Sequence, residues 1–249
     1  MSDKATKTDV LIIGASASGL MCAIEAGKRG RKVTVLDHAN KAGKKILTYG
    51  GGRCNFTTYD ISADNYISHN PHFCKSARSR YTQWDFIAMV SEHNIPFHEK
   101  NHGQLFCDHS AKDILNMLLE ECEKAGVKIR LKCEINSVDK SGNIFTTNTS
   151  LGAFQSESLV IASGGLSIPK MCASPFGYKV AEQFGHHIWP TTAGLVPITL
   201  QPHDKEMLSE LSGVSVDAVV SNERISFREN FLFTHRGLSG PAILQISSY

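Results

Sequence analysis

The hexapeptide GASASG at residues 14–19 has the residue types and spacing of a turn that binds a diphosphate. Such a turn needs a glycine for the tight bend, a small residue where the backbone approaches the pyrophosphate, and a glycine for helix–strand packing. Gly14 and Gly19 occupy the outer positions, with Ala15 after the first, while Ser16 replaces the middle glycine with a small hydroxyl side chain. Backbone N–H groups at the start of the next helix would face the phosphates. The turn therefore predicts a dinucleotide site, with a doubly wound domain that binds no ligand as the alternative.

A carboxylate stands where the ribose of such a nucleotide would lie. Asp37 ends the apolar run KVTVL (residues 32–36) and follows Gly14 by 23 positions, 37 − 14. An acid at about this distance accepts the hydroxyls of the adenosine ribose and disfavours a 2′-phosphate. The pattern therefore argues against NADP as the occupant of this site.

Three further segments carry candidate contacts. The small residues Ala162, Ser163 and Gly164 follow the apolar run LVI at 159–161, and they would let a cofactor approach the backbone at a strand end. Arg53, within GGGRCN at 50–55, offers a cation for a diphosphate or an electron-rich ring; lysines 44 and 45 could add to it, but a charge pair of this kind is usually a solvated face. His235, before a Gly/Ser turn, is the candidate acid or base, with a simple turn as the alternative. The histidines show no metal-ligand spacing, so no metal site is predicted.

The elements that position these residues follow from hydrophobic spacing. The runs at 10–13 and 32–36 flank the glycine turn and a helix, which predicts a right-handed βαβ crossover in a parallel sheet. Residues 41–72 are Gly-rich and lack periodicity, so they predict a long functional loop. A helix capped at Ser110 is predicted up to Gly126, followed by a strand, an antiparallel meander at 135–154 and a separate short strand at 159–161. The predicted fold is α/β, with a Rossmann-like domain at 1–190 and a β-rich part at 191–249.

Composition sets the outer bounds of the function. The 249 residues contain 26 basic and 24 acidic side chains, a net charge of +2, which predicts no strong electrostatic field and no nucleic-acid partner. Seven dispersed cysteines without a C-x-x-C pair are typical of free thiols in the cytoplasm. The uncharged and largely apolar stretch at residues 10–24 is shorter than the ~20 residues that span a bilayer, so no membrane partner is expected.

The motifs together resemble the BaiN-like (YhiN-like) family of NAD(P)/FAD-dependent oxidoreductases. The resemblance rests on GASASG with Asp37, on residues 43–57, 162–169 and 175–178, and on residues 232–244, and it covers essentially the whole chain. It implies a FAD domain of the glutathione-reductase type, interrupted by a β-rich domain. Two departures are Ser16 in the fingerprint and Ser163 where the family usually has threonine. Because family members continue for a further segment that returns to the FAD domain, the chain is expected to be an N-terminal part.

The same resemblance implies roles for individual residues. Gly14, Ala15, Ser16 and Gly19 would surround the pyrophosphate, and Asp37 would bind the AMP ribose. Ile135 would meet the adenine through its backbone, and Ser163 with Gly164 would approach the flavin. The remaining residues along the cofactor would be Lys45, Gly52, Arg53 and Asn55.

The leading hypothesis is a FAD-dependent oxidoreductase that moves a hydride between NADH or NADPH and a small organic substrate. One alternative is a flavin-dependent RNA-modifying enzyme, which the charge of +2 does not favour. The other is a non-catalytic nucleotide-binding fragment. The sequence leaves the substrate and the oligomeric state open.

Overall fold

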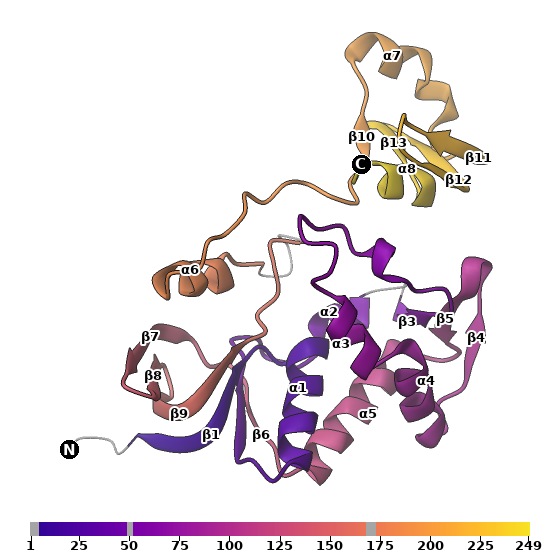
Figure 1. Cartoon of the computed structure of the whole chain (residues 1–249). Helices are drawn as coiled ribbons and strands as arrows, with labels where there is room; N and C mark the ends of the chain where they lie inside the picture. The colour runs from indigo at the N-terminus through magenta and orange to yellow at the C-terminus, as the bar shows by residue number, and fades with distance from the viewer. Residues whose placement is uncertain (1–4, 49–51, 168–172) are drawn as a thin grey trace. The chain divides into compact units, whose positions relative to one another are not determined.

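The computed structural model describes residues 5–48, 52–167 and 173–249, and it divides into two compact units (Figure 1). The first unit comprises Met1–His187 and the second Ile188–Tyr249. Of the motifs predicted to bind the cofactor, residues 49–51 and 168–169 lie outside the described residues. Within the described ranges, no helix has both the length and the apolar character needed to cross a bilayer.

A six-stranded mixed sheet forms the centre of the first unit. Its order is β6-β2-β1-β9-β8-β7, in which β6, β2, β1 and β9 are parallel and β9, β8 and β7 form an antiparallel meander. The strands are β1 (Thr6–Ile13), β2 (Val33–Leu36), β6 (Lys128–Arg130), β7 (Ile135–Ser141), β8 (Ile144–Thr149) and β9 (Gly152–Ile161). This arrangement confirms the predicted Rossmann-like α/β class with a small antiparallel meander.

Helices cover the sheet because alternate residues of its central strands face opposite ways. Ile12 of β1 joins a cluster with α1 (Ala17–Lys28) and α5 (Ala111–Lys124), whereas Ile13 joins a separate cluster with α6 (Phe176–Gln183). Strands buried on both faces are typical of parallel sheets. The Ser110 cap of α5 is confirmed, since its hydroxyl accepts the Lys112 N–H at 3.2 Å.

Two expectations about local structure were wrong. Residues 152–161 form one strand, β9, rather than a meander strand followed by a separate one: its first part pairs antiparallel with β8, and residues 154–161 pair parallel with β1. Residues 41–72 are not a structureless loop either, because they contain short elements that the sequence does not mark by periodicity. These are α2 (Lys44–Thr48), β3 (Asn55–Thr58) and η2 (Ala63–Asn65).

Strand β3 belongs to a second, three-stranded sheet in the first unit. Its order is β3-β5-β4, with β4 at Phe97–Glu99 and β5 at Gln104–Cys107, and all pairings are antiparallel. The 3-10 turn η3 (Asn101–Gly103) joins β4 to β5. Two helices, α3 (Lys75–Arg80) and α4 (Gln83–Glu92), come between β3 and β4 in the chain, and the side chain of Thr82 caps α4.

The second unit is built around a four-stranded antiparallel sheet of order β10-β13-β12-β11. The strands are β10 (Ile198–Thr199), β11 (Ser215–Ser221), β12 (Ser226–Thr234) and β13 (Gly237–Ser239). The helical elements are α7 (Pro202–Met207), η5 (Ser209–Leu211) and α8 (Pro241–Ile246), and α8 begins at a proline, a residue preferred at the first helical position.

Candidate functional site

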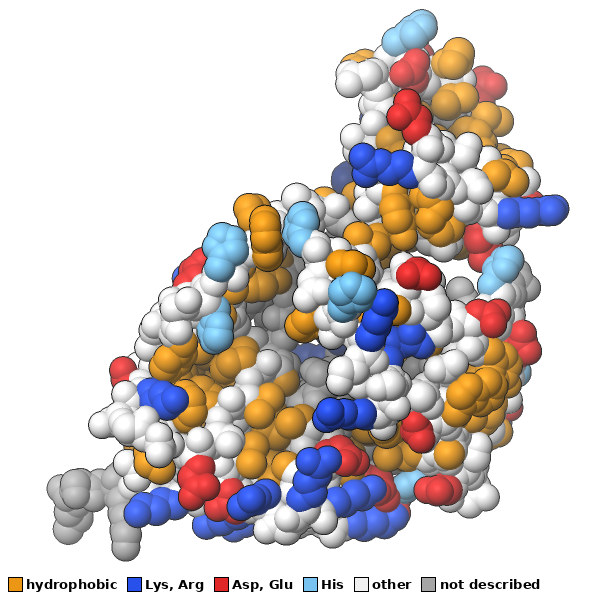
Figure 2. Space-filling view, viewed as in Figure 1, with side chains coloured by type: hydrophobic (Ala, Val, Ile, Leu, Met, Phe, Trp, Pro, Cys, Tyr) orange, Lys and Arg blue, Asp and Glu red, His pale blue; other side chains and the backbone are white. Residues whose placement is uncertain are grey.

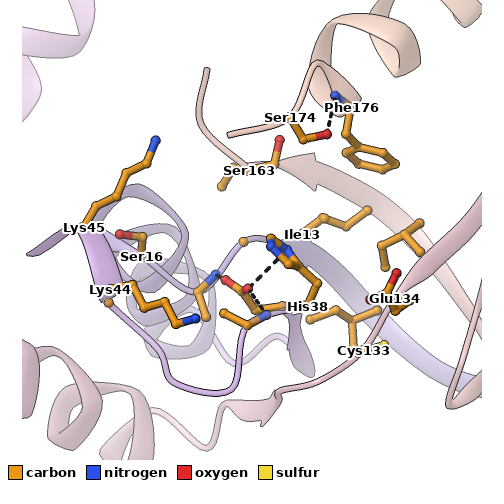
Figure 3. Close-up of a pocket in the computed structure, with 18 of the residues that line it drawn as sticks. Ile13, Ser16, His38, Lys44, Lys45, Cys133, Glu134, Ser163, Ser174 and Phe176 are labelled. Carbon is orange, nitrogen blue, oxygen red and sulfur yellow. Dashed lines mark hydrogen bonds and ion pairs between the residues drawn. The ribbon is translucent and has the colours of Figure 1, made fainter. Parts of the chain in front are cut away.

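A cavity of about 290 Å³ opens at the carboxyl ends of β1, β2 and β9, where ligands bind in open α/β sheets (Figure 3). It brings together residues that are far apart in the sequence. Eight of the residues predicted for the cofactor line it: Gly14, Ala15, Ser16, Asp37, Lys45, Ile135, Ala162 and Ser163. The sequence therefore identified the position of this cavity.

The glycine turn is shaped by two positions at which a side chain has no room. Gly14 has φ of +118°, and a Cβ placed on it would overlap the carbonyl group of Ala162 on the neighbouring strand. A Cβ on Gly19 would overlap the carbonyl oxygen of Gly14, so α1 can approach β1 closely only with glycine there. The result is a cradle of bare backbone beside the first turn of a twelve-residue helix. Such a cradle fits a diphosphate, because N–H groups and the helix dipole both favour an anion.

Ser16 occupies the N-cap position of α1 in an extended conformation, with φ of −115° and ψ of −166°. Among the described residues its hydroxyl caps no N–H, and the side chain is half-buried at the wall of the cavity. A serine in place of the usual glycine therefore leaves its hydroxyl available to a ligand in the cradle.

Asp37, which directly follows β2, is hydrogen-bonded to the turn at residues 14–19. One carboxylate oxygen accepts the Ala15 N–H at 2.7 Å, and the other accepts the Ala39 N–H at 2.8 Å. His38 lies close by, with its Nδ1 3.6 Å from the same carboxylate (Figure 3). Two amide contacts use only part of the accepting capacity of a carboxylate, which has about four lone-pair sites. Ribose hydroxyls are thus chemically compatible partners for the rest.

A second cavity, of about 380 Å³, lies on the other side of the turn. It shares Ser16, Lys45, Ala162 and Ser163 with the first cavity, so these residues form the wall common to both. Its remaining walls come from α1, β3, α4 and α5, and they include Asn55 and Gly164 among the predicted residues. Both cavities together offer a polar half at Asp37 and a more apolar half near Phe56 and Phe86, as a dinucleotide with a flavin ring requires.

Lys45 is placed between the two halves by α2. Its ammonium nitrogen donates to the Ser167 hydroxyl at 3.1 Å. The same nitrogen lies close to Gly164, since a Cβ added to that glycine would be only 3.3 Å from it. Figure 3 shows Lys44 and Lys45 on the α2 side, opposite Ser163 and Phe176. The lysine pair therefore faces the cavity rather than forming only a solvated surface.

Four predicted residues do not line these cavities. Gly19 acts through packing, and Gly52 and Arg53 belong to neither set of lining residues, although the Arg53 carbonyl accepts the Cys107 N–H at 3.0 Å. His235 is exposed in the second unit, in a turn between β12 and β13 that Thr234 closes. The catalytic role of His235 stays a prediction. Cys54, which follows Arg53, is buried, and burial raises the pKa of its thiol, which opposes a role as an activated nucleophile.

Sequence reasoning missed several residues of the first cavity. Cys133 and Glu134 reach it because the Cys133 N–H donates to the Asp37 carbonyl at 3.0 Å, which holds the chain after β6 against the end of β2. Ser174 and Phe176 come from the segment that begins α6, where the Ser174 hydroxyl accepts the Phe176 N–H at 3.2 Å. The motif PFGY at 175–178 was the available signal for the second pair.

Comparison with known proteins identifies the family of the chain. The Rossmann domain of the HI0933-like proteins matches residues 8–214. The chain belongs to the HI0933-like protein family. The barrel and H2TH domain of the same HI0933-like family matches residues 192–249. The flavoprotein family expected from the motifs is thus confirmed, together with the FAD-binding type of Rossmann fold.

Two relatives within the family share one name. An Escherichia coli (strain K12) protein named "Ribosomal RNA dihydrouridine synthase" is 55% identical over 97% of this chain and 60% of its own length. A Haemophilus influenzae protein of the same name is 48% identical over 96% of this chain and 61% of its own length. A Clostridium scindens "3-dehydro-bile acid delta(4,6)-reductase" is 26% identical, over 96% and 59%. The chain thus spans about three-fifths of the length of these relatives.

The names of the first two relatives overturn one expectation. The net charge of +2 was taken to argue against a nucleic-acid partner, yet two proteins that match almost the whole chain are named for action on ribosomal RNA. That expectation was wrong because a net charge sums over the whole surface and carries no information on how charges are distributed.

Solved structures share the fold at lower similarity. A 3-ketosteroid-delta4-(5alpha)-dehydrogenase from Rhodococcus jostii RHA1 is 13% identical with a TM-score of 0.48, covering 66% of this chain and 47% of that one. A glycine oxidase from Geobacillus kaustophilus is 16% identical with a TM-score of 0.41, covering 65% and 56%.

Proposed function

We propose that the protein containing this chain is a FAD-dependent reductase that converts uridine in ribosomal RNA to dihydrouridine. The observation that carries the proposal is the 55% identity over 97% of the chain with a protein of that name. This replaces the small-molecule substrate of our leading sequence hypothesis with its RNA alternative. The free thiols Cys22, Cys54, Cys74, Cys107, Cys122 and Cys133 agree with a cytoplasmic location, which we propose as well.

FAD, when bound, supplies hydride transfer, and the residues described above bind and orient it. The cradle at residues 14–19 and the start of α1 hold the pyrophosphate, and Asp37 holds the AMP ribose. Ile135 borders the adenine end, where a shift of register between Ile135 and Ser137 opens the pairing of β7 with β8. Asn55, Lys45, Ser163 and Gly164 lie along the flavin half. Gly52 and Arg53 stay predicted contacts outside both cavities.

The reaction adds two hydrogens across the C5–C6 double bond of uracil. One arrives as a hydride and the other as a proton, so each turnover consumes one hydride donor, for which we propose NADH or NADPH. The bile-acid relative is also named as a reductase, and its name places the reaction at positions 4 and 6 of a ring system. Reduction of a carbon–carbon double bond would thus be common to both named activities.

The test uses the full-length protein, loaded with FAD, and ribosomal RNA from cells that lack the gene. Nucleosides from the digested RNA are separated, and dihydrouridine is measured by mass spectrometry. We expect dihydrouridine to form only with FAD, a reduced nicotinamide nucleotide and the protein together. If no dihydrouridine forms while the same preparation reduces a 3-oxo-4,6-diene steroid, the substrate class is wrong and the flavin chemistry right.

A further inference from the structure

A surface of exposed aromatic and basic side chains adjoins the flavin half of the site. We define it as the 59–84 surface: it runs from Tyr59 through η2 and α3 to Trp84 at the start of α4. Its aromatic rings are unusually open to solvent, with exposed fractions of 79% for Phe73, 57% for Trp84 and 46% for Tyr66. Large exposed rings of this kind mark binding surfaces when they gather in one place.

The charge on this surface is of one sign beyond its first part, which carries the two exposed acids Asp60 and Asp64. Residues 66–84 contain no aspartate or glutamate, whereas Lys75, Arg78 and Arg80 all come from α3. Figure 2 shows Lys, Arg and His side chains over the region where Figure 1 places α3. Asp85, which ends the segment, already accepts the Thr82 N–H at 2.6 Å and the Thr82 hydroxyl at 2.7 Å. The surface thus fits a polyanion, although the whole chain is nearly neutral.

Three of these rings, Tyr59, Tyr66 and Trp84, are held by contacts within the surface. Tyr59 and Trp84 stack with their centroids 5.4 Å apart and an interplanar angle of 23°. The Arg78 guanidinium lies 5.8 Å from the centroid of Tyr66 and donates to the Ile61 carbonyl at 2.5 Å. Ordered rings beside cations provide platforms on which unpaired bases stack, and stacking contributes about 1–3 kcal/mol per base.

The surface is continuous with the candidate cofactor site. A third cavity, of about 420 Å³, is lined by Tyr66, Arg78 and Tyr81 of this surface and by residues of β3. It shares Asn55, Phe56 and Phe86 with the 380 Å³ cavity assigned to the flavin half. A ligand strand bound on the 59–84 surface would therefore lie next to the cavity in which a reacting base would meet the flavin.

We propose that the 59–84 surface docks a single-stranded segment of the RNA substrate, with the cations of α3 on its phosphates and the exposed rings under its bases. The inference rests on the proposed function. A single strand is required because the C5–C6 bond of a stacked, paired uridine cannot reach a flavin in a protein cavity without leaving the helix. An acidic protein segment would use the cations but gives no reason for the exposed, stacked rings.

The experiment measures binding of a fluorescent oligouridylate and of a duplex RNA to the full-length, FAD-loaded protein. The charge variant is Lys75→Gln/Arg80→Gln, and its matched control is Lys128→Gln/Arg130→Gln, which removes two exposed cations from β6. Each phosphate contact adds about 0.7 to the slope of log K against log salt for a single strand. The charge variant should lower that slope by about 1.4 and, at 0.1 M salt, raise Kd about 20-fold, while the control keeps both values.

Stacking is tested separately with Phe73→Ser and its control Leu151→Ser, an exposed leucine between β8 and β9. Loss of one stacked base should raise the Kd for oligouridylate about 5-fold or more, with no change for the Leu151 variant. Absorption of bound flavin verifies that all variants keep FAD. Either surface variant binding oligouridylate like wild type overturns the inference, as does equal competition by polyglutamate or a preference for the duplex.

Failure of the docking inference is distinguishable from failure of the proposed function. If wild type forms dihydrouridine and both surface variants form it with an unchanged kcat/KM for RNA, the docking surface is wrong and the function stands. If wild type neither binds oligouridylate nor forms dihydrouridine while holding FAD, both are wrong. A lower kcat/KM for RNA in the surface variants, with unchanged flavin reduction by the nicotinamide nucleotide, supports the inference.

Discussion

Asp37→Asn is the most direct perturbation of the candidate cofactor site. Aspartate and asparagine have the same shape, so the change removes the charge and replaces one acceptor oxygen with an NH₂ donor. In the structure the two oxygens accept the N–H groups of Ala15 and Ala39 at 2.7 and 2.8 Å. Asparagine can accept only one of them, and its NH₂ group then faces the other N–H.

The magnitude follows from these contacts. A hydrogen bond to a charged group contributes about 1.5–3 kcal/mol, and one of the two is lost outright. Because Ala15 belongs to the pyrophosphate turn, we expect that loss to appear in cofactor binding. A loss of this size raises the Kd for FAD about 10- to 150-fold. Asparagine also has one acceptor oxygen fewer for the ribose hydroxyls, which would raise the Kd for FAD further.

The assay titrates the flavin-free, full-length protein with FAD and follows flavin fluorescence. Asp9→Asn is the matched control, since the Asp9 carboxylate accepts the Lys32 N–H at 2.7 Å where β1 and β2 begin to pair, away from the cavity. The control should keep the Kd for FAD within about twofold of wild type. If Asp37→Asn also stays within twofold, or if both variants weaken FAD equally, the assignment of Asp37 to the ribose and turn is refuted.

Three further outcomes are expected. Gly14→Val should abolish FAD retention, because its Cβ would overlap the Ala162 carbonyl, whereas Gly30→Val, at a positive φ of 74° with open space around it, should retain flavin absorbance after gel filtration. Glu121→Gln should lower the free energy of unfolding at pH 7 by about 1 kcal/mol, because Lys28 and Lys124 are about half exposed and solvent screens both ion pairs. Lys28, Lys124 and His93 surround that carboxyl, and the hydrogen bond from Lys28 is the main cause that lowers its pKa to about 2. The stabilisation is therefore present above about pH 4.5 and is lost toward pH 2, so urea unfolding curves of variant and wild type should converge over that window. Burial, with nearby Cys54, raises the pKa of Cys107 to about 12, so iodoacetamide at pH 7.5 should modify it only after unfolding, as peptide mass spectrometry would show; rapid modification of the native protein would contradict the described burial.

The parts of the fold that sequence predicted are those encoded by local spacing. The crossover β1–α1–β2 and the capped helix α5 follow from short apolar runs, glycines and a capping box, all within thirty residues. The turn at 14–19 and Asp37 follow from the same segment, so the polar half of the site was predictable. Ile135 was placed at the site only through the family resemblance, since its approach depends on pairing between distant strands, whereas Ser163 was also expected from the small residues that follow the apolar run at 159–161.

Strand β9 shows why long-range pairing was missed. Its first half pairs with both β8 and β1, and there the buried residues Phe154 and Ser156 alternate with less buried ones. After the exposed Glu157 and Ser158, only the last three residues, 159–161, are apolar, because they pair with β1 and pack against the helix-covered clusters. A change of environment along one strand changes the sequence pattern, and local reading then divides the strand in two.

The error about nucleic acid has a different physical origin. At physiological salt the Debye length is about 8 Å, so a phosphate responds to the side chains near it and not to the charge of the whole chain. A total of +2 is compatible with Lys75, Arg78 and Arg80 on one short helix without an intervening acid. It is equally compatible with Glu120 and Glu121 beside Lys124 on α5, where opposite charges cancel locally. An RNA partner is therefore predicted better by two local features: the length of a segment whose charges have one sign, and exposed rings beside those charges. Residues 66–84 have both features.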